Sequence, residues 1–467
     1  MYIYSKTLFF AFTIIFLANA TYANQFKYVR DVEVGNEPVG VFYDSQNDQF
    51  HIFCKGTDKN FNSIFEPDSG DVVPTWWTLK TESSGEIKEL KKVKEFEFNS
   101  IPFPFRPAYA PTDRIIFINH YDGIAVYNLD NYQQIGEKLD FLGVNGLDYR
   151  SGHLLISKTT FGLTVDTLII YSIAQNKVMN KYPVGKNLLY AKMFQPNNPD
   201  FKGIAAISVG SFGSDSSALH IARFSHFQQP EFADTLIGNT ANYLDIIDNK
   251  FLVVPVMLSN KFILTDLNND SYFSTITLGE EPSWDGPSFS KLCRIKSNEN
   301  LTKSEYLIFT TTYSGNLEIH RFSNNELPEG EYERSIEFLN TIELKNKGEA
   351  LDFSTISENG IIQVVVANSL KQDYSSNNTV SLINIEGITS VTNETQDSFF
   401  LLSDNQLKFS GNIYTNSNFC IFDINGNTVR TVDNINSIST LNLTSGTYIA
   451  KYFDGFRSYL YKFNIVR

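Results

Sequence analysis

The stretch GNLEIHRFSNNE, residues 315–326, carries the pattern that decides the fold. Apolar and polar residues interchange over a short run, and Ser-Asn-Asn then favours a turn, which predicts a strand of about six residues and a hairpin. Similar strand-and-turn units begin at residues 74, 123, 166, 217, 260 and 378. Helical periodicity over a long window is nearly absent, so we expect an all-β repeat protein.

A second series of marks interleaves with these units. An apolar residue, a glycine and a few polar residues precede another short apolar strand, with copies at Gly35, Gly143, Gly185, Gly238, Gly279 and Gly348. Residues 101–109, with three prolines, take the place of a seventh copy. The combined period of roughly 50 residues is that of propeller blades. We therefore expect a β-propeller of seven four-stranded blades around a channel.

Six or eight blades remain possible, because residues 54–73 and 323–342 read as irregular insertions. Ring closure favours seven. Residues 26–34 form a strand before the first glycine mark, and the last blade, residues 348–388, stops after its third strand. Pairing residues 26–34 with residues 380–385 would complete that blade and remove an exposed edge.

Composition excludes several function classes. The 467-residue chain has a formal net charge of −14, and its basic residues are interspersed with acidic ones, so no nucleic-acid footprint appears. The three cysteines, Cys54, Cys293 and Cys420, are far apart and make no zinc motif, and buried free thiols are the favoured interpretation over one disulfide. We expect no metal, no cofactor and no transmembrane segment.

The two ends of the chain carry signals for export and sorting. Lys6 and the apolar residues 7–17 fit a signal peptide cleaved after Ala23. Residues 24–388 would be the propeller, residues 389–398 a polar linker and residues 399–467 a small C-terminal β-sandwich.

Three motifs in this tail carry a family resemblance. They are IFDINGN, with Asp423 and the turn glycine Gly426; LNLTSGTYI, with Gly446 and Tyr448; and the terminal KFNIVR, which begins at Lys462. In order, spacing and position they resemble the type A sorting domain of type IX secretion substrates. Asn427 departs from the basic residue usual in that family. The resemblance implies export across the outer membrane of a Bacteroidetes-type bacterium, removal of the tail, and release or attachment at the cell surface. The alternative is a plain accessory or carbohydrate-binding β-sandwich.

One turn of the repeat region, VGNEPVGVF at residues 34–42, resembles the surface-layer-like YVTN propellers, which are WD-like in architecture. The YVTN tetrapeptide itself is missing. This resemblance implies architecture and no activity.

Candidate binding residues are few. Asp148, Asp245 and Asp352 recur at similar points of the predicted innermost strands and could converge in the channel, to hold a hard cation or act as acid–base groups. They could equally bind backbone amides or pair with Lys192 or Arg106. Trp76, Trp77 and Trp284 could stack on a sugar or anchor a protein, or lie buried between blades.

No catalytic motif is apparent, so no catalytic residue is assigned. The favoured hypothesis is a secreted or cell-surface binding protein that interacts with the type IX machinery and with an extracellular protein or glycan. The alternatives are an extracellular hydrolase or lyase at the channel mouth and a structural component of the cell surface.

Overall fold

The computed structural model describes residues 25–465, with gaps at 61, 63, 98–106, 121, 161–164, 197–200, 211–216, 226–229, 281–283, 298–302, 328–330, 358, 388–399, 404–405, 410–417, 424–427, 434–436, 440–442, 445 and 454–457. The chain divides into two compact units, residues 1–388 and 389–467, and each is described by itself.

Unit 1 consists of consecutive antiparallel sheets, of which seven occur among the described residues. We number them sheet 1 to sheet 7 in chain order. Their first strands are β2 (Pro38–Asp44), β6 (Ala108–Ala110), β9 (Val144–Arg150), β13 (Leu188–Phe194), β17 (Asp245–Ile247), β21 (Pro287–Ser297) and β25 (Lys347–Phe353). Their second strands are β3 (Gln49–Cys54), β7 (Ile115–His120), β10 (His153–Lys158), β14 (Phe201–Ser208), β18 (Phe251–Val256), β22 (Lys303–Thr312) and β26 (Ile362–Leu370).

The third strands are those that the 315–326 pattern predicts. They are β4 (Thr75–Thr81), β8 (Gly123–Asn128), β11 (Thr167–Ser172), β15 (Ser217–Ser225), β19 (Lys261–Asp266), β23 (Asn316–Glu326) and β27 (Ser376–Glu386). The fourth strands of sheets 1 and 3 to 6 are β5 (Ile87–Glu95), β12 (Lys177–Pro183), β16 (Ala233–Gly238), β20 (Asn269–Thr277) and β24 (Tyr332–Glu343). In sheet 2 the place of a fourth strand is marked by isolated bridges, Ile124 to Leu139 and Tyr127 to Gln134.

One expectation about the repeats was wrong. Residues 323–342 are no insertion, because they contain the end of β23 and most of β24, two long strands paired from Asn316 with Glu343 to Glu326 with Tyr332. Their many charged residues face solvent on the outer strand, which disguised the strand pattern. Residues 54–73 do contain irregular structure, including the short 3₁₀ helix η1 (Pro67–Ser69).

No helix among the described residues is long and apolar enough to cross a membrane.

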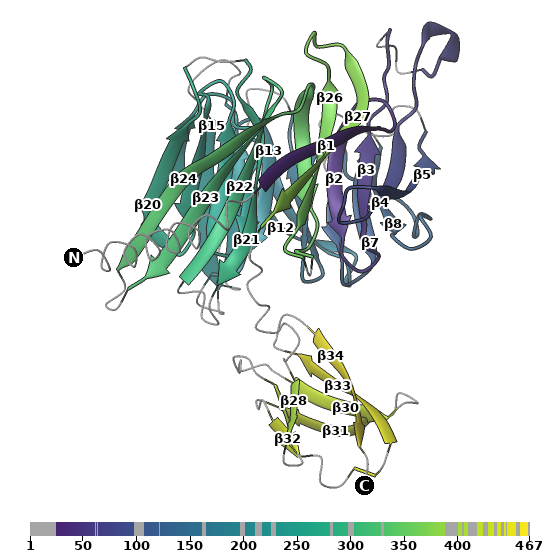
Figure 1. The fold of residues 1–467 in the computed structure, drawn as a ribbon, viewed down its shortest axis with the longest axis vertical. Coiled ribbons are helices and arrows are strands. Elements are labelled where there is room, and N and C mark those ends of the chain that lie inside the picture. Colours follow the sequence, from purple (N-terminus) through teal and green to yellow (C-terminus); the bar gives the residue numbers. More distant parts are fainter. Residues whose placement is uncertain are drawn as a thin grey trace, which may run out of the picture. The chain divides into compact units, whose positions relative to one another are not determined.

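The N-terminal strand completes the last sheet, as expected. Strand β1 (Gln25–Glu33) pairs antiparallel with β27, with Phe26 opposite Ile385 and Val32 opposite Val380. Figure 1 shows the two strands side by side, although they lie at opposite ends of the unit's sequence. Sheet 7 thereby has the order β1-β27-β26-β25.

The first strands of successive sheets contact one another around a closed path. Contacts join β6 to β9, β9 to β13, β13 to β17, β17 to β21, β21 to β25, and β25 back to β2. The remaining step, from β2 to β6, is made by Phe42 and Tyr109, whose rings stack 4.4 Å apart. Sheets that follow one another around a ring make a β-propeller.

The hydrophobic core lies between neighbouring sheets. Between sheets 5 and 6, for example, Phe251 and Phe262 pack with Tyr306 and Phe322, and all four are buried. Each sheet is therefore covered by apolar side chains on the faces it shares with its neighbours, which explains the near-continuous apolar runs of the second strands.

Unit 2 contains two sheets among its described residues. One has the order β28 (Phe400–Ser403), β29 (Gln406–Phe409), β32 (Ser437–Ser439). The other has the order β31 (Thr428–Asp433), β30 (Asn418–Asp423), β33 (Gly446–Phe453), β34 (Ser458–Ile465).

Candidate functional site

The three candidate aspartates lie on first strands, as the sequence predicted, and each binds a backbone amide of the next sheet. The N–H of Met193 donates to Asp148 Oδ2 at 2.9 Å. The N–H of Leu292 donates to Asp245 Oδ2 at 3.3 Å, and the N–H of Tyr43 donates to Asp352 Oδ2 at 2.9 Å. Each carboxylate therefore links its own sheet to the following one.

Two lysines alternate with these aspartates around the ring. The Nζ atom of Lys192, on β13, lies 2.6 Å from Asp245 Oδ1, and the Nζ atom of Lys291, on β21, lies 2.6 Å from Asp352 Oδ1. Five successive first strands thus present Asp, Lys, Asp, Lys and Asp. Lys192 was expected as a possible partner of these aspartates and Lys291 was not; Arg106 lies outside the described residues.

The electrostatics of this group, which we call the aspartate–lysine ladder, follow from its burial. Burial alone would lower the pKa of Lys192 and Lys291, but Asp245 and Asp352 raise both above the ordinary lysine value. Burial raises the pKa of Asp148, and the opposing effects of Lys192 and of the Met193 amide are smaller. Each of the two ion pairs joins two sheets and neutralises both of its charges, whereas Asp148 makes no ion pair among the described residues and is held by the Met193 amide.

The ladder offers no metal centre. Within the part of the chain that the structure describes, no three His, Cys, Asp or Glu side chains form a group that could hold a metal ion. Both oxygens of Asp245 and of Asp352 already accept hydrogen bonds, from a lysine and from a backbone amide.

The candidate tryptophans fall into different environments. Trp76 is completely buried and its Nε1–H donates to His51 Nδ1 at 3.0 Å, so it serves the core between sheets 1 and 2. Trp77 is half-buried and donates to Thr75 Oγ1 at 2.9 Å. Trp284 is 69% exposed in the turn before β21, where it can contact a ligand.

A Ser–His–Asp arrangement that sequence reasoning missed spans three adjacent strands of sheet 4. Ser208 Oγ lies 2.7 Å from His220 Nε2, and His220 Nδ1 lies 2.7 Å from Asp234 Oδ1. Because the carboxylate can only accept, Nδ1 donates to it, and in the neutral ring Nε2 accepts from the serine hydroxyl. These are the bonds of an activated serine nucleophile.

Access argues against catalysis at Ser208. Ser208 is 3% exposed, whereas the Asp234 side chain is 64% exposed, the reverse of what a nucleophile requires. Gly185, with φ of +55°, covers the pair so closely that a Cβ there would lie 2.5 Å from Ser208 Oγ. Gly238 covers Ser259 in the same way at sheet 5, and Gly35 covers Thr75 at sheet 1. A covered hydroxyl is therefore a recurring device of the fold.

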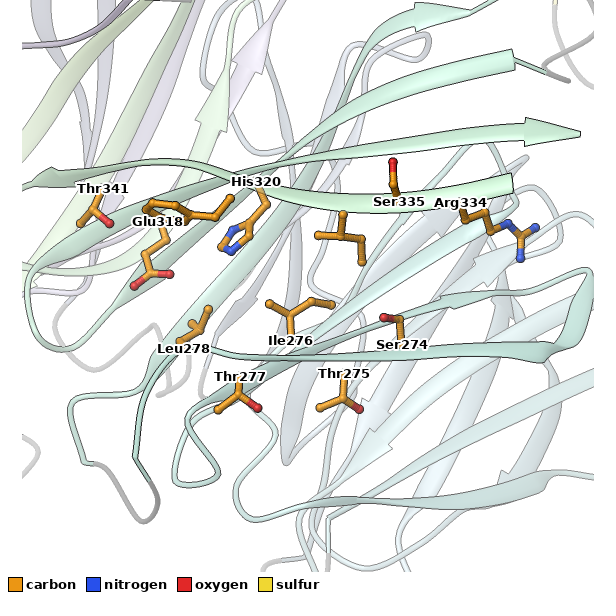
Figure 2. A pocket seen from close by; sticks show the side chains of 12 residues that line it. Ser274, Thr275, Ile276, Thr277, Leu278, Glu318, His320, Arg334, Ser335 and Thr341 are labelled. Carbon is orange, nitrogen blue, oxygen red and sulfur yellow. The ribbon is translucent and has the colours of Figure 1, made fainter. Parts of the chain in front are cut away.

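A groove of about 740 Å³ lies between sheets 5 and 6, and Figure 2 shows the side chains that line it. Ile276 and Leu278 enter from the β20 side, Glu318 and His320 from β23, and Phe338 from β24. His320 is 4% exposed, yet its Nδ1 has no hydrogen-bond partner among the described residues. No sequence signal distinguished Glu318 and His320 from other alternating residues of the 315–326 stretch.

Some residues of the predicted sorting motifs and cleavage site are among the described residues, and others are not. Tyr448 is buried on β33, opposite Asp423, and its hydroxyl donates to the Thr444 carbonyl at 2.9 Å. Gly446 begins β33, and Lys462 lies on β34 opposite Ile449. Ala23 and Gly426 fall outside the described residues.

The prediction of buried thiols outside any disulfide is confirmed for Cys54 and Cys293. Cys420 is half-buried and also forms no disulfide. Burial raises the pKa of both buried thiols to about 12, which makes them poor nucleophiles and poor metal ligands at neutral pH.

Comparison with known proteins gives fold-level likenesses. No family model matches the chain, and no curated protein matches it. Among solved structures, the WD40 β-propeller domain of Doa1 is 11% identical with a TM-score of 0.47, over 77% of this chain and 97% of that one. The Neurospora crassa Pan2 WD40 domain is 9% identical with a TM-score of 0.45, over 77% and 95%. The extracellular domain of BT4673 from B. thetaiotaomicron is 12% identical with a TM-score of 0.45, over 96% of this chain and 59% of that one.

Proposed function

We propose that this chain is an exported binding protein without catalytic activity, in which unit 1, a seven-bladed propeller, holds an extracellular partner. The aspartate–lysine ladder is the observation that carries this proposal. Its carboxylates, the best acid–base candidates of the sequence, are bound to lysines and backbone amides. A rigid ring with occupied central charges leaves recognition to the surface grooves and loops.

A screen of the chain from residue 24 to 467 against protein and glycan arrays tests binding. We expect saturable binding of a partner to the native chain. The Asp148→Asn variant should bind the same partner, because that carboxylate has a structural role. Capture of no protein or glycan by the folded chain would oppose the proposal.

Export and sorting are the second part of the proposal. The signal-like residues 1–23 support entry into the periplasm, and the resemblance of residues 399–467 to type A sorting domains supports passage through the type IX machinery to the outside. Deletion of residues 390–467 in a bacterium with this machinery should retain unit 1 in the periplasm. Normal surface delivery of the shortened chain would overturn this part.

A hydrolase is the alternative that one observation favours, the bond sequence from Asp234 through His220 to Ser208. A fluorophosphonate probe separates the two functions, because it labels activated serines covalently. We expect no label on the native chain. Labelling that Ser208→Ala abolishes would establish the hydrolase instead.

A further inference from the structure

Glu318 lacks the counter-charge that four carboxylates in the interior of unit 1 have. Asp44 is paired with Arg114, Asp245 with Lys192, Asp352 with Lys291 and Asp266 with Arg334. Glu318 is half-buried on β23 and has neither an ion pair nor a hydrogen bond within the described residues. Burial raises its pKa, as expected for a carboxylate without a cation nearby.

The groove around Glu318 supplies no positive charge. His320, two residues further along the same face of β23, is neutral at pH 7, because burial lowers its pKa to about 4. Arg334 lines the opposite end of the groove, as Figure 2 shows, and is bound there to Asp266. An incoming cation would therefore meet an unneutralised carboxylate in a partly desolvated place, where a charge-assisted hydrogen bond is strong.

Apolar surface flanks the carboxylate. Phe338 is 58% exposed and its ring lies edge-on to His320, with centroids 5.4 Å apart. Ile276 and Leu278 line the groove from the β20 side, and in Figure 2 both lie between β20 and His320. An aliphatic stem can pack along this surface while its charged head reaches Glu318, and the face of Phe338 attracts a cation.

The strands beside the groove favour a polypeptide as the source of that side chain. Strands β20 and β24 are the last strands of their sheets, so each has one edge without a strand partner among the described residues. Ser274 and Thr341 also line the groove. An extended segment could hydrogen-bond to these groups, and a groove of about 740 Å³ accepts a few residues.

We propose that the groove between β20 and β23–β24 binds an extended segment of a partner protein through a lysine or arginine side chain, whose cationic head pairs with Glu318 and whose stem packs against Phe338. This inference rests on the proposed binding function and names its ligand class.

The test uses the chain from residue 24 to 467 and two short synthetic peptides, acetyl-Ile-Lys-Ile-amide and its norleucine counterpart, titrated by NMR. An arginine version shows which basic head is preferred. The lysine peptide should bind about tenfold more tightly than the norleucine peptide, a difference of about 1.4 kcal/mol, because only the lysine head makes a charge-assisted hydrogen bond to Glu318. Glu318→Gln should abolish this preference, and so identifies the site.

Glu337→Gln is the matched control. This variant makes the same charge change at a position of β24 that lies between two groove residues. Because side chains alternate along a strand, the Glu337 side chain is on the face away from the groove, and the variant should leave binding unchanged. A thermal unfolding scan of each variant shows that it is folded, so that a loss of binding is not mistaken for a loss of structure. Glu318→Gln should unfold at the same or a higher temperature, because it removes a desolvated charge.

Equal binding of the lysine and norleucine peptides, or full binding by Glu318→Gln, would overturn the inference. Binding of a glycan at the groove instead of the peptides would also overturn the inference. If the peptides fail but the chain still captures a partner from the protein array, this inference alone is wrong. If the array also finds nothing, the binding function fails with it.

Discussion

Asp245 shows how a channel carboxylate stabilises the fold. Its side chain is 6% exposed, and that of its partner Lys192 is 18% exposed. Asp245→Asn leaves the lysine charge buried without its counter-ion, so we expect the free energy of unfolding to fall by about 2–3 kcal/mol. Urea unfolding followed by fluorescence measures this.

Asp122→Asn is the matched control for Asp245→Asn, because it breaks the exposed pair with Lys138. It should change stability by less than about 1 kcal/mol. A combined Lys192→Met and Asp245→Asn variant should lose less than the sum of the single variants. Additive losses would show that the two side chains do not interact.

Gly185 makes a second residue-scale prediction. Gly185→Ala combines strain at φ of +55° with a Cβ lying 2.5 Å from Ser208 Oγ, so it should destabilise the fold by more than about 2 kcal/mol. Gly152→Ala has φ of +78° and nothing within 4 Å, and it should lose only about 1 kcal/mol. Urea titrations of the two variants separate crowding from strain. Equal losses would contradict close packing over Ser208.

At the scale of the element, β1 is the strand whose partner lies furthest away in sequence. Val32 is 3% exposed and packs with Val380 and Leu382. Val32→Asp should lower the unfolding temperature strongly, because it buries a charge in sheet 7. Arg30→Asp makes an exposed carboxylate on the same strand and should have little effect. Calorimetry on both variants decides, and equal effects would show that β1 is not part of the core.

The elements of unit 1 were predictable because their signals are local. The alternation in residues 315–326 involves neighbours in the sequence, and all seven copies became third strands. The turn predicted at Ser323, Asn324 and Asn325 was wrong, because these residues continue β23 and pair with β24. Closure by β1 was also predictable, from one surplus strand and one incomplete sheet. The 323–342 segment was misread because an outer strand with charged side chains loses the apolar pattern on its exposed face.

The candidate site was predictable only in part. The recurring aspartates were visible, but their lysine partners were not identified by local pattern, since the pairs are separated by 53 and 61 residues. The Ser208–His220–Asp234 bonds depend on the registers of β14, β15 and β16, which the sequence leaves open. The groove at Glu318 depends on which side chains lack partners, and that is a property of the packed structure.

For the whole molecule, buried histidines make stability depend on pH. Burial lowers the pKa of His120 and of His320 to about 4, against about 6.5 in an unfolded chain. Between these values the unfolded state binds more protons, so stability falls as the pH drops from about 6.5 to 4. We expect the unfolding temperature to decline over this window.

A variant carrying His120→Gln and His320→Gln should show a shallower decline in the same buffers. The pKa of Asp44 lies below its ordinary value: burial opposes ionisation, but the nearby His51 and the hydrogen bonds from Arg114 outweigh it. Its stabilising effect is lost only below about pH 4. The two contributions therefore fall in separate windows, and an unchanged slope in the histidine variant would refute this assignment.

Thiol reactivity reports on the intact fold. Cys54 and Cys293 are buried with raised pKa, whereas Cys420 in unit 2 is half-buried. A disulfide reagent such as Ellman's should modify at most Cys420 in the native chain and all three thiols in denaturant. Cys420→Ser should then leave no rapid reaction. Fast labelling of the remaining thiols would show that the sheets of unit 1 open readily.

The pairing of β1 with β27 also sets an order of events in biosynthesis. Strand β1 is synthesised before the other described strands of unit 1, and it has no strand partner until residues 376–386 arrive. Until then both margins of the growing ring stay open, and each can recruit a foreign strand. A chaperone that holds β1 extended would therefore protect unit 1 until its last strand has been made.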